Sequence, residues 1–343
     1  MTCGGTAPVG GTATVRQKLN VAQLAAKQLD GAKIAIAIMD TGINRVHVSG
    51  KLGHPILLDA TNSWTPAGIS ALPGNHAIDH GSMCAYDALM IAPNATLLDF
   101  PILSSNVPGG SMMGGTLSVA LLAFAQLIVG WGVAFAKGGL AARYTGLVVS
   151  NSWGIFHPSW DFPVGHPGRY CDNPRHPFNL IVSTLASAGA DIVFAAGNCG
   201  AQCADGRCNG RTTQAIMGAS AHPDVLTLAG CDTNDRRVGY SSQGPSIAGM
   251  HQQKPDITAY THFLGSESFG SGSPDSGTSA ACPVAAGCVA ALRTRLPLAA
   301  TPPANLFVQL RATARQVSGP VGWNGDYGFG IIDPLAAANA MGL

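Results

Sequence analysis

An aspartate, a histidine and a serine in this chain stand where their side chains could carry out nucleophilic catalysis together. Asp40 follows an apolar run, His80 opens a segment of helical character, and Ser279 follows a glycine-threonine turn. A serine hydroxyl is a weak nucleophile at neutral pH, so it needs a base such as imidazole to remove its proton. The imidazole needs a carboxylate that fixes its tautomer and stabilises its cation. The chain order Asp, His, Ser is one of three orders known for such a triad.

The stretch around Ser279 suits a reaction that builds up an oxyanion. Residues 277–283 read Gly-Thr-Ser-Ala-Ala-Cys-Pro, and the small apolar residues after them predict a helix that begins near Ser279. Free backbone N–H groups and the positive end of the helix dipole would then face whatever Ser279 contacts. By itself the stretch is more typical of an ordinary turn and helix cap. The catalytic interpretation of Ser279 therefore depends on its distant partners.

Asn198 is a candidate donor to the oxyanion. It ends the run Ala-Ala-Gly-Asn at 195–198, after a predicted strand, where a side-chain amide could donate to developing negative charge. Alone, Asn198 would be read as a turn residue. His80 alone would be read as a loop histidine, since the chain has ten histidines. The set of four residues supports the chemistry better than any member does.

The elements that must position these residues alternate between strands and helices. Apolar runs predict strands over 33–39, 96–102, 147–150, 191–195 and 225–229, and helices over 15–29, 80–89, 179–188, 284–295 and 304–314. This alternation predicts an α/β fold with a mostly parallel sheet. Ligands bind at the carboxyl ends of strands in such sheets, which is where Asp40 and Asn198 fall.

Residues 116–136 contain no charged side chain. The length of this segment is compatible with a transmembrane helix. Glycines and polar residues dilute its hydrophobicity, however, and it falls between two predicted strands. We therefore expect a buried crossover helix and no membrane partner.

Composition narrows the class of protein. The 343 residues carry a net charge of +1 and only 11% are charged, so the basic stripe of a nucleic-acid-binding protein is absent. Residues 1–14 are expected to be flexible, and residues 15–343 to form a single domain, acting as a monomer. The first fifteen residues lack the features of a secretory signal, which indicates a cytoplasmic protein or a processed form of an exported one.

The nine cysteines suggest disulfides. An odd number leaves at least one free thiol if all pairing is internal. Cys171, Cys199, Cys203 and Cys208 lie in a loop-rich region, and their pairing, with Cys231 as a further candidate, does not follow from the sequence. Free thiols or a zinc site are alternatives, although C-x3-C-x4-C is not a strong zinc pattern.

Together these motifs resemble those of the subtilases, the subtilisin-like serine peptidases of family S8. The resemblance rests on six segments that occur in the family's order from about residue 33 to the C-terminus. The segments are 36–43, 80–85, 91–95, 151–154, 195–198 and 277–283.

The resemblance implies a three-layer fold, in which a mostly parallel seven-stranded sheet carries helices on both faces. It also implies a serine endopeptidase that cleaves a peptide or protein substrate through an acyl-enzyme. Ser279 would be the nucleophile, His80 the general acid and base, and Asp40 its orienting partner. Asn198 would hold the oxyanion together with the Ser279 N–H. The implied substrate-binding residues are Ser152, Trp153, Gly154, Gly109, Gly110, Ala196, Gly197 and Met217, of which Met217 would floor an apolar P1 pocket.

The chain departs from the family pattern at several points. Ser82 and Met83 replace the usual threonine and histidine after His80-Gly81. The segment that follows is short where many subtilisins carry a strong calcium site. We therefore expect that site to be missing and no cofactor to be needed, with calcium as the one candidate. Residues 155–178 and 199–214 look like insertions, and we expect their disulfides to stiffen the loop after Asn198 in place of calcium.

Two alternatives to a general hydrolase remain open. A specialised maturation protease or peptide ligase/cyclase would form the same acyl-enzyme but could pass the acyl group to an amine. An inactive subtilase fold would act as a binding module, although all four chemical positions are intact in this sequence.

Overall fold

Strand β1 (Ile34–Met39) lies at the centre of the sheet in the computed structural model, which describes residues 1–104, 112–133, 140–317 and 321–343. The isoleucines of β1 point to one face and its alanines to the other, because successive side chains of a strand alternate. All six residues of β1 are buried, as expected for a parallel strand covered by helices on both faces.

The main sheet has seven strands in the order β2-β3-β1-β4-β5-β6-β7, and every neighbouring pair is parallel. The other strands are β2 (Leu57–Leu58), β3 (Thr96–Phe100), β4 (Gly146–Asn151), β5 (Asp191–Ala195), β6 (Leu226–Cys231) and β7 (Ile257–Tyr260). A small antiparallel hairpin joins β8 (Phe263–Leu264) to β9 (Pro274–Asp275). The predicted fold class is confirmed, although β2 and β7 were not predicted.

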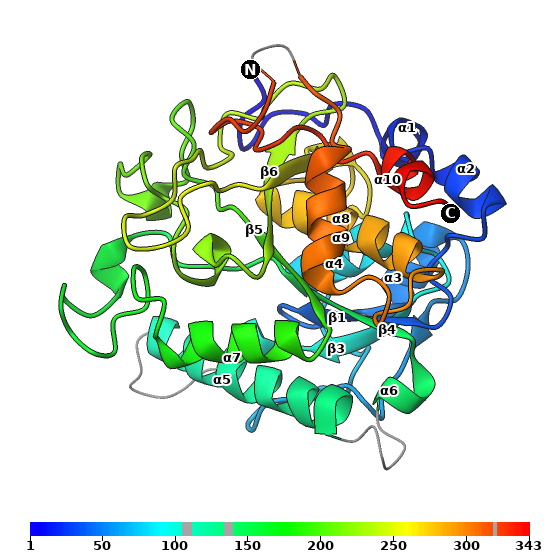
Figure 1. The fold of residues 1–343 in the computed structure, drawn as a ribbon, viewed down its shortest axis with the longest axis horizontal. Helices are drawn as coiled ribbons and strands as arrows, with labels where there is room; N and C mark the ends of the chain where they lie inside the picture. Colours follow the sequence, from blue (N-terminus) through cyan, green and yellow to red (C-terminus); the bar gives the residue numbers. More distant parts are fainter. Residues whose placement is uncertain (105–111, 134–139, 318–320) are drawn as a thin grey trace.

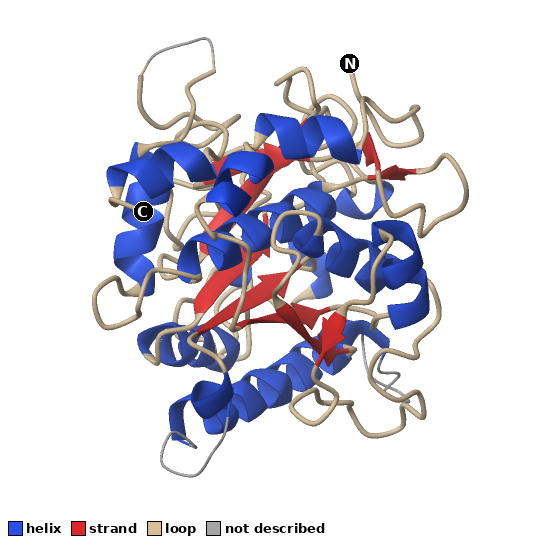
Figure 2. Ribbon diagram, turned by 90° about the vertical axis from the view of Figure 1, so that its right-hand side faces the viewer, coloured by secondary structure: helices blue, strands red, loops and turns tan. Residues whose placement is uncertain are grey.

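Helices cover the two faces of the sheet unequally (Figures 1 and 2). The face formed by the isoleucines of β1 packs against α4 (His80–Leu89) and α8 (Thr278–Arg293). Around these lie α1 (Thr12–Lys18), α2 (Val21–Ala26), α3 (Arg45–Leu52), α9 (Pro303–Ala312) and α10 (Pro334–Ala340). The opposite face packs against α5 (Met112–Ile128), α6 (Leu140–Arg143) and α7 (Pro177–Ser187). Helix α8 is buried along its whole length, which explains its small apolar residues.

Short helical turns complete the elements. They are the 3-10 helices at Ile102–Ser104, Pro158–Trp160, Gly206–Cys208 and Gly218–Ala221, and a π-helical turn at Val129–Val133.

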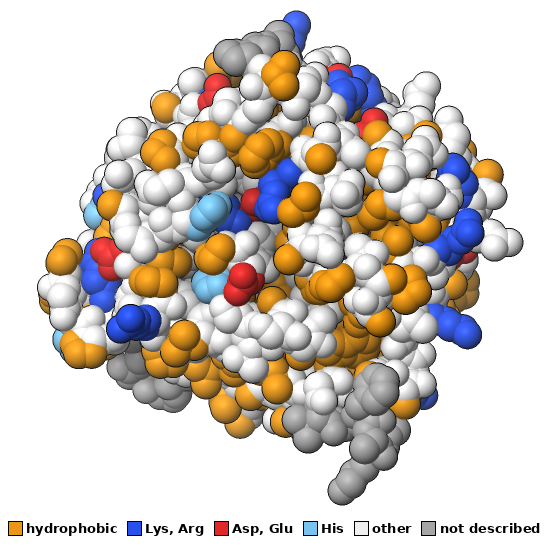
Figure 3. Space-filling view, in the orientation of Figure 1, with side chains coloured by type: hydrophobic (Ala, Val, Ile, Leu, Met, Phe, Trp, Pro, Cys, Tyr) orange, Lys and Arg blue, Asp and Glu red, His pale blue; other side chains and the backbone are white. Residues whose placement is uncertain are grey.

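The described part of the uncharged segment, residues 116–133, forms most of α5 and the π-helical turn after it, between β3 and β4 as predicted. The expectation of a buried helix was wrong, because this segment packs on the sheet with one side only and leaves Leu122 and Val129 more than half exposed. Phe124 packs edge-on against Phe178 of α7, with ring centroids 5.1 Å apart. Among the described helices, none is both long and apolar enough to cross a membrane. Figure 3 shows hydrophobic side chains reaching the surface along the edge where α5 and α7 lie, and Leu122 and Leu180 are among those exposed.

The N-terminal segment has defined partners on the body of the protein. Val9 N–H donates to the His262 carbonyl over 2.8 Å, and Gly11 pairs with Leu264 of β8. Helix α1 begins at Thr12, inside the segment 1–14 that was expected to be flexible. One helix was predicted over 15–29, but the left-handed backbone of Asn20 (φ 55°) separates α1 from α2.

Candidate active site

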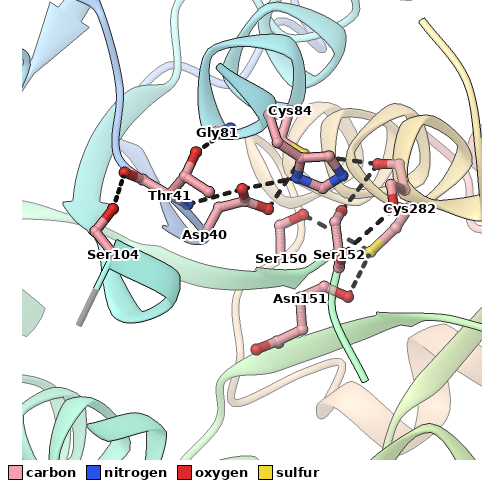
Figure 4. Close-up of polar contacts among 11 residues, drawn as sticks. Asp40, Thr41, Gly81, Cys84, Ser104, Ser150, Asn151, Ser152 and Cys282 are labelled. Atoms are coloured by element: carbon pink, nitrogen blue, oxygen red, sulfur yellow. Dashed lines mark hydrogen bonds and ion pairs between the residues drawn. The ribbon is translucent and has the colours of Figure 1, made fainter. Parts of the chain in front are cut away.

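Asp40 and His80 meet at the carboxyl end of β1. Asp40 directly follows the strand, and His80 is the first residue of α4. The Nδ1 atom of His80 lies 2.7 Å from Oδ1 of Asp40 (Figure 4), whose carboxylate is 1% exposed. A buried carboxylate at this position favours the tautomer that carries its proton on Nδ1. The Nε2 atom is then free to act as a base.

The basicity of His80 follows from two opposing effects. Burial lowers the pKa of its imidazole, but the charge of Asp40 and the hydrogen bond to it outweigh burial, so that the pKa is raised above the usual 6.5. The side chain remains 26% exposed, so the ring can exchange protons with a ligand or with solvent. An imidazole with this pKa is suited to general acid and base catalysis near neutral pH.

Thr41 fixes the loop after β1 against the start of α4. Its Oγ1 accepts a hydrogen bond from Gly81 N–H over 2.9 Å, and its carbonyl accepts one from Ser104 Oγ over 2.6 Å (Figure 4). A side chain at Gly81 would place its Cβ 2.4 Å from the Gly42 carbonyl. The close approach that holds His80 beside Asp40 therefore requires glycine at position 81.

Ser279 lies in the first turn of α8, and a proline determines the hydrogen bonds of its carbonyl. Pro283 stands four residues further on inside the helix and has no N–H to donate. The Ser279 carbonyl instead accepts from Ser152 Oγ over 2.9 Å and from Cys84 Sγ over 3.6 Å (Figure 4). The end of β4 and helix α4 are thereby both tied to the turn that carries Ser279.

The hydroxyl of Ser279 lies in the cleft but does not contact the imidazole. It donates to the Ser152 carbonyl over 3.3 Å, and no hydrogen bond joins it to His80 in the described part of the chain. A contact of this length is weak. A rotation about the side-chain torsion of Ser279 therefore costs little.

The amide of Asn198 is oriented by the residue before Ser279. Asn198 Oδ1 accepts from Thr278 N–H over 2.8 Å and from Thr278 Oγ1 over 3.1 Å. Thr278 Oγ1 also accepts from Gly197 N–H over 3.0 Å. Because Oδ1 is held by these donors, the NH2 group of Asn198 is left free to donate. The role of Thr278 was missed from the sequence, where Gly-Thr-Ser reads simply as a turn.

His80, Asn198 and Ser279 open onto one cleft of about 1030 Å³, whereas Asp40 is buried behind His80. Six of the predicted substrate-binding residues line the cleft: Ser152, Trp153, Gly154, Ala196, Gly197 and Met217. Gly109 and Gly110 lie outside the described residues. Met217 is nearly fully buried, and the small part of its side chain that lines the cleft is apolar.

The two segments interpreted as insertions meet at the rim of the cleft. The Arg207 guanidinium lies over the Phe156 ring, 3.8 Å from its centroid, and pairs through two hydrogen bonds with Asp205. The disulfide Cys199–Cys208 closes the loop that follows Asn198. Neither Phe156 nor Arg207 was predicted to line the cleft, because their contact joins segments distant in sequence.

The prediction for the cysteine cluster was partly wrong. Cys203 is bonded to Cys3, which brings the N-terminal segment to the cleft, where Gly4 is a lining residue. Cys171 is a buried free thiol. It lies in the core on the α5 and α7 face, in a different cluster from Cys199 and Cys208. The zinc alternative for Cys199, Cys203 and Cys208 is excluded, because all three sulfurs are taken by disulfides. The free thiols are Cys84, Cys171, Cys231, Cys282 and Cys288.

Cys84 lies one helical turn after His80, and its thiol contacts the carboxylate of Asp40. Its Sγ is 3.5 Å from Asp40 Oδ2 and 3.8 Å from His80 Nδ1. Burial, reinforced by the charge of Asp40, raises the pKa of the Cys84 thiol well above its usual value. Cys84 is therefore a neutral thiol, and its single S–H can donate either to Asp40 Oδ2 or to the Ser279 carbonyl. Within the described ranges, these three side chains form the one group with the spacing of a metal site.

Comparison with known proteins identifies the class of protein that this site belongs to. The sequence model of the subtilase family matches residues 31–330, so the chain belongs to the subtilase family and is a serine-type peptidase. No curated protein sequence matches it.

Solved structures with the same fold include those of MycP1. With its N-terminal propeptide removed, MycP1 has a TM-score of 0.62 and 21% identity, over 94% of this chain and 96% of that one. MycP1 from Mycobacterium smegmatis has a TM-score of 0.63 and 20% identity, over 98% and 88% of the two chains. At these identities the similarity concerns the fold.

Proposed function

We propose that this subtilase is an endopeptidase that hydrolyses peptide bonds through an acyl-enzyme on Ser279. The observation that carries the proposal is the 2.7 Å contact between Asp40 and His80, whose imidazole lines the cleft that also holds Ser279. That contact prepares Nε2 of His80 as a base, and a serine in the same cleft is the nucleophile that such a base activates.

The reaction begins when the Ser279 hydroxyl leaves the Ser152 carbonyl and turns toward Nε2 of His80. Ser279 Oγ attacks the carbonyl carbon of the substrate while His80 takes the hydroxyl proton. His80 then gives this proton to the leaving amine, which departs and leaves the acyl-enzyme. Water attacks the ester while His80 takes its proton; His80 then returns this proton to Ser279 Oγ as the ester bond breaks and the carboxylic acid product leaves. Asp40 stabilises the imidazolium in both halves of the reaction.

Two donors stabilise the oxyanion that forms in each half of the reaction. One is the NH2 group of Asn198, which Thr278 leaves free, and the other is the N–H of Ser279 at the start of α8. Donors that are already oriented toward developing charge stabilise the transition state more than the ground state.

The substrate would bind in extended form along Ser152, Trp153 and Gly154, which continue from β4 at the rim of the cleft. Pairing with an exposed main chain aligns a peptide regardless of its sequence, while pockets supply the specificity. Met217 and Ala196 line the cleft with apolar surface, which supports a preference for an apolar P1 side chain.

A cleavage profile on a peptide library tests the proposal. The wild type is expected to cleave after apolar residues and to react with a fluorophosphonate, and Ser279→Ala should do neither. A folded wild type that neither reacts nor cleaves would contradict the proposal and favour a binding module. Adding a second peptide with a free N-terminus separates the ligase alternative, because a ligase gives joined rather than hydrolysed products.

A further inference from the structure

Asp87 is a buried carboxyl group that the proposed mechanism does not use. It lies in α4, seven residues after His80, and its side chain is completely buried. No N–H or O–H group of the described residues reaches either of its oxygens. An ionised carboxylate without donors in a protein interior costs several kcal/mol. A neutral, protonated carboxyl group at this position avoids that cost.

The side chain that Asp87 faces is a second carboxyl group, that of Asp275 in β9, within hydrogen-bonding contact. Asp275 has donors of its own: Ser266 N–H binds one oxygen over 2.6 Å and Ser266 Oγ binds the other over 2.5 Å. Two facing carboxylates repel each other, and such pairs hold one proton between them. Because only Asp275 has donors, the proton belongs on Asp87.

We propose that Asp87 is protonated in the folded enzyme and donates its proton to Asp275. This O–H···O bond joins the helix that carries His80 to the hairpin strand that ends four residues before Ser279. Asp87 is thus a positioning residue: it contacts neither substrate nor the reacting atoms, but it links the helix that carries His80 to the strand that leads into the turn before Ser279.

The groups around the pair agree with this assignment. Burial raises the pKa of Asp87 well above its usual value, and the charge of Asp275 raises it further. Burial also raises the pKa of Asp275, to about 6, against the opposing bonds from Ser266. From α3, His47 contacts the Ser266 carbonyl over 2.8 Å, and its charge lowers the pKa of Asp275.

Two further titratable neighbours belong to α4 itself. The Tyr86 hydroxyl is bound to Thr12 Oγ1 over 2.7 Å, and the Cys84 thiol faces Asp40. The pKa of each is raised above its usual value, chiefly by burial, so both are neutral near pH 7. None of these groups brings a positive charge to Asp87 that would favour its ionised form.

The first test is the pH dependence of stability in Asp87→Asn, which keeps a donor toward Asp275 but cannot ionise. Both proteins would carry Ser279→Ala to prevent autolysis. The unfolded chain releases the Asp87 proton near the ordinary carboxyl pKa of about 3.9, whereas the folded wild type retains it. The unfolding constant of the wild type, divided by that of the variant, should therefore rise about tenfold or more per pH unit between about pH 4.5 and 6.5. A constant ratio would overturn the proposal.

The second test detects the proton directly by infrared spectroscopy at pH 7. The carbonyl stretch of a neutral carboxylic acid should be present in the wild type and in Asp275→Asn, and lost in Asp87→Asn. A wild type without this band would overturn the proposal. So would stabilisation of the wild type, but not of Asp87→Asn, by CaCl2 or NaCl, because a cation would then bridge the carboxylates.

The effect on catalysis rests on the proposed function, whereas the proton itself does not. In the otherwise wild-type enzyme, the alkaline limb of the kcat profile should extend to higher pH in Asp87→Asn, because the link to Asp275 can no longer be lost by ionisation. Asp87→Ala, which removes the donor, should lower kcat more than it changes KM. An unchanged alkaline limb, with the infrared band present, would refute the positioning role alone.

Discussion

The carbonyl of Ser279 allows the placement of the nucleophile to be tested by stability alone. Its helical donor is missing because Pro283 has no N–H, and Ser152 Oγ supplies its main hydrogen bond at 2.9 Å. The other donor, the Cys84 thiol at 3.6 Å, is weak. Ser152→Ala leaves this buried acceptor almost unsatisfied, which we expect to lower the free energy of unfolding by about 1–3 kcal/mol.

Pro283→Ala provides the matched control, because it restores the missing N–H. An alanine at 283 can donate to the Ser279 carbonyl in the regular helical pattern. In the Pro283→Ala background, Ser152→Ala should therefore cost about 1 kcal/mol less than in the wild type, since the carbonyl keeps a donor.

The assay is urea unfolding of four proteins: the parent, the two single variants and the double variant. All would carry Ser279→Ala, which abolishes autolysis and keeps the carbonyl in place. The slopes with urea should agree, so that the midpoints report stability. The reasoning is refuted if the effects of Ser152→Ala and Pro283→Ala add to within about 0.3–0.5 kcal/mol, the behaviour of sites that do not interact.

Four further outcomes are expected. Asn198→Ala should lower kcat by about 10²–10³-fold with little change in KM, the usual cost of one oxyanion donor. A rise in KM of similar size, with kcat little changed, would count against that role. Burial lowers the pKa of His80 but Asp40 raises it by more, so activity should rise with pH through a pKa above 6.5. In Asp40→Asn this acidic limb of the pH profile should move to lower pH, and an unmoved limb would exclude His80 as the base. Cys199→Ser opens a disulfide between residues 9 apart, and should cost about 2–3 kcal/mol in urea unfolding, whereas no loss would show that the bond does not stiffen the loop. EDTA should leave the thermal midpoint unchanged, and a fall that calcium reverses would reveal a calcium site.

The residues of the site could be predicted because each lies after the end of a predicted strand or at the start of a predicted helix. The apolar run before Asp40 predicts a buried parallel strand, and the small residues after Ser279 predict a packed helix. Both patterns are local, and the carboxyl ends of parallel strands converge whatever the details of the fold. Sequence order alone therefore brought Asp40 and Asn198 to the same edge of the sheet.

The contacts that join distant segments could not be predicted. The disulfide from Cys3 to Cys203 spans 200 residues, and no local pattern marks Cys3 as its partner. The residues of β7 lack the long apolar run of a central strand, because this strand lies at the edge of the sheet. Asp87 reads as an ordinary polar residue of a helix, and only its burial shows that it needs a proton.

The first turn of α8 is held from several directions, and this explains how Ser279 is positioned in a helix that contains a proline. Gly277 N–H donates to the Tyr240 hydroxyl over 3.1 Å, and the Gly277 carbonyl accepts from Thr261 Oγ1 over 2.7 Å. Together with the bonds of Thr278 to Asn198, these contacts connect the turn to the loops that contain Asn198, Tyr240 and Thr261, and not to the rest of the helix. These bonds have separate donors, so the removal of one leaves the others in place. Single substitutions around Ser279 should therefore cost stability before they cost alignment. The side-chain amide of Asn198 should be the more sensitive part of the site, because among the described residues Thr278 alone binds it.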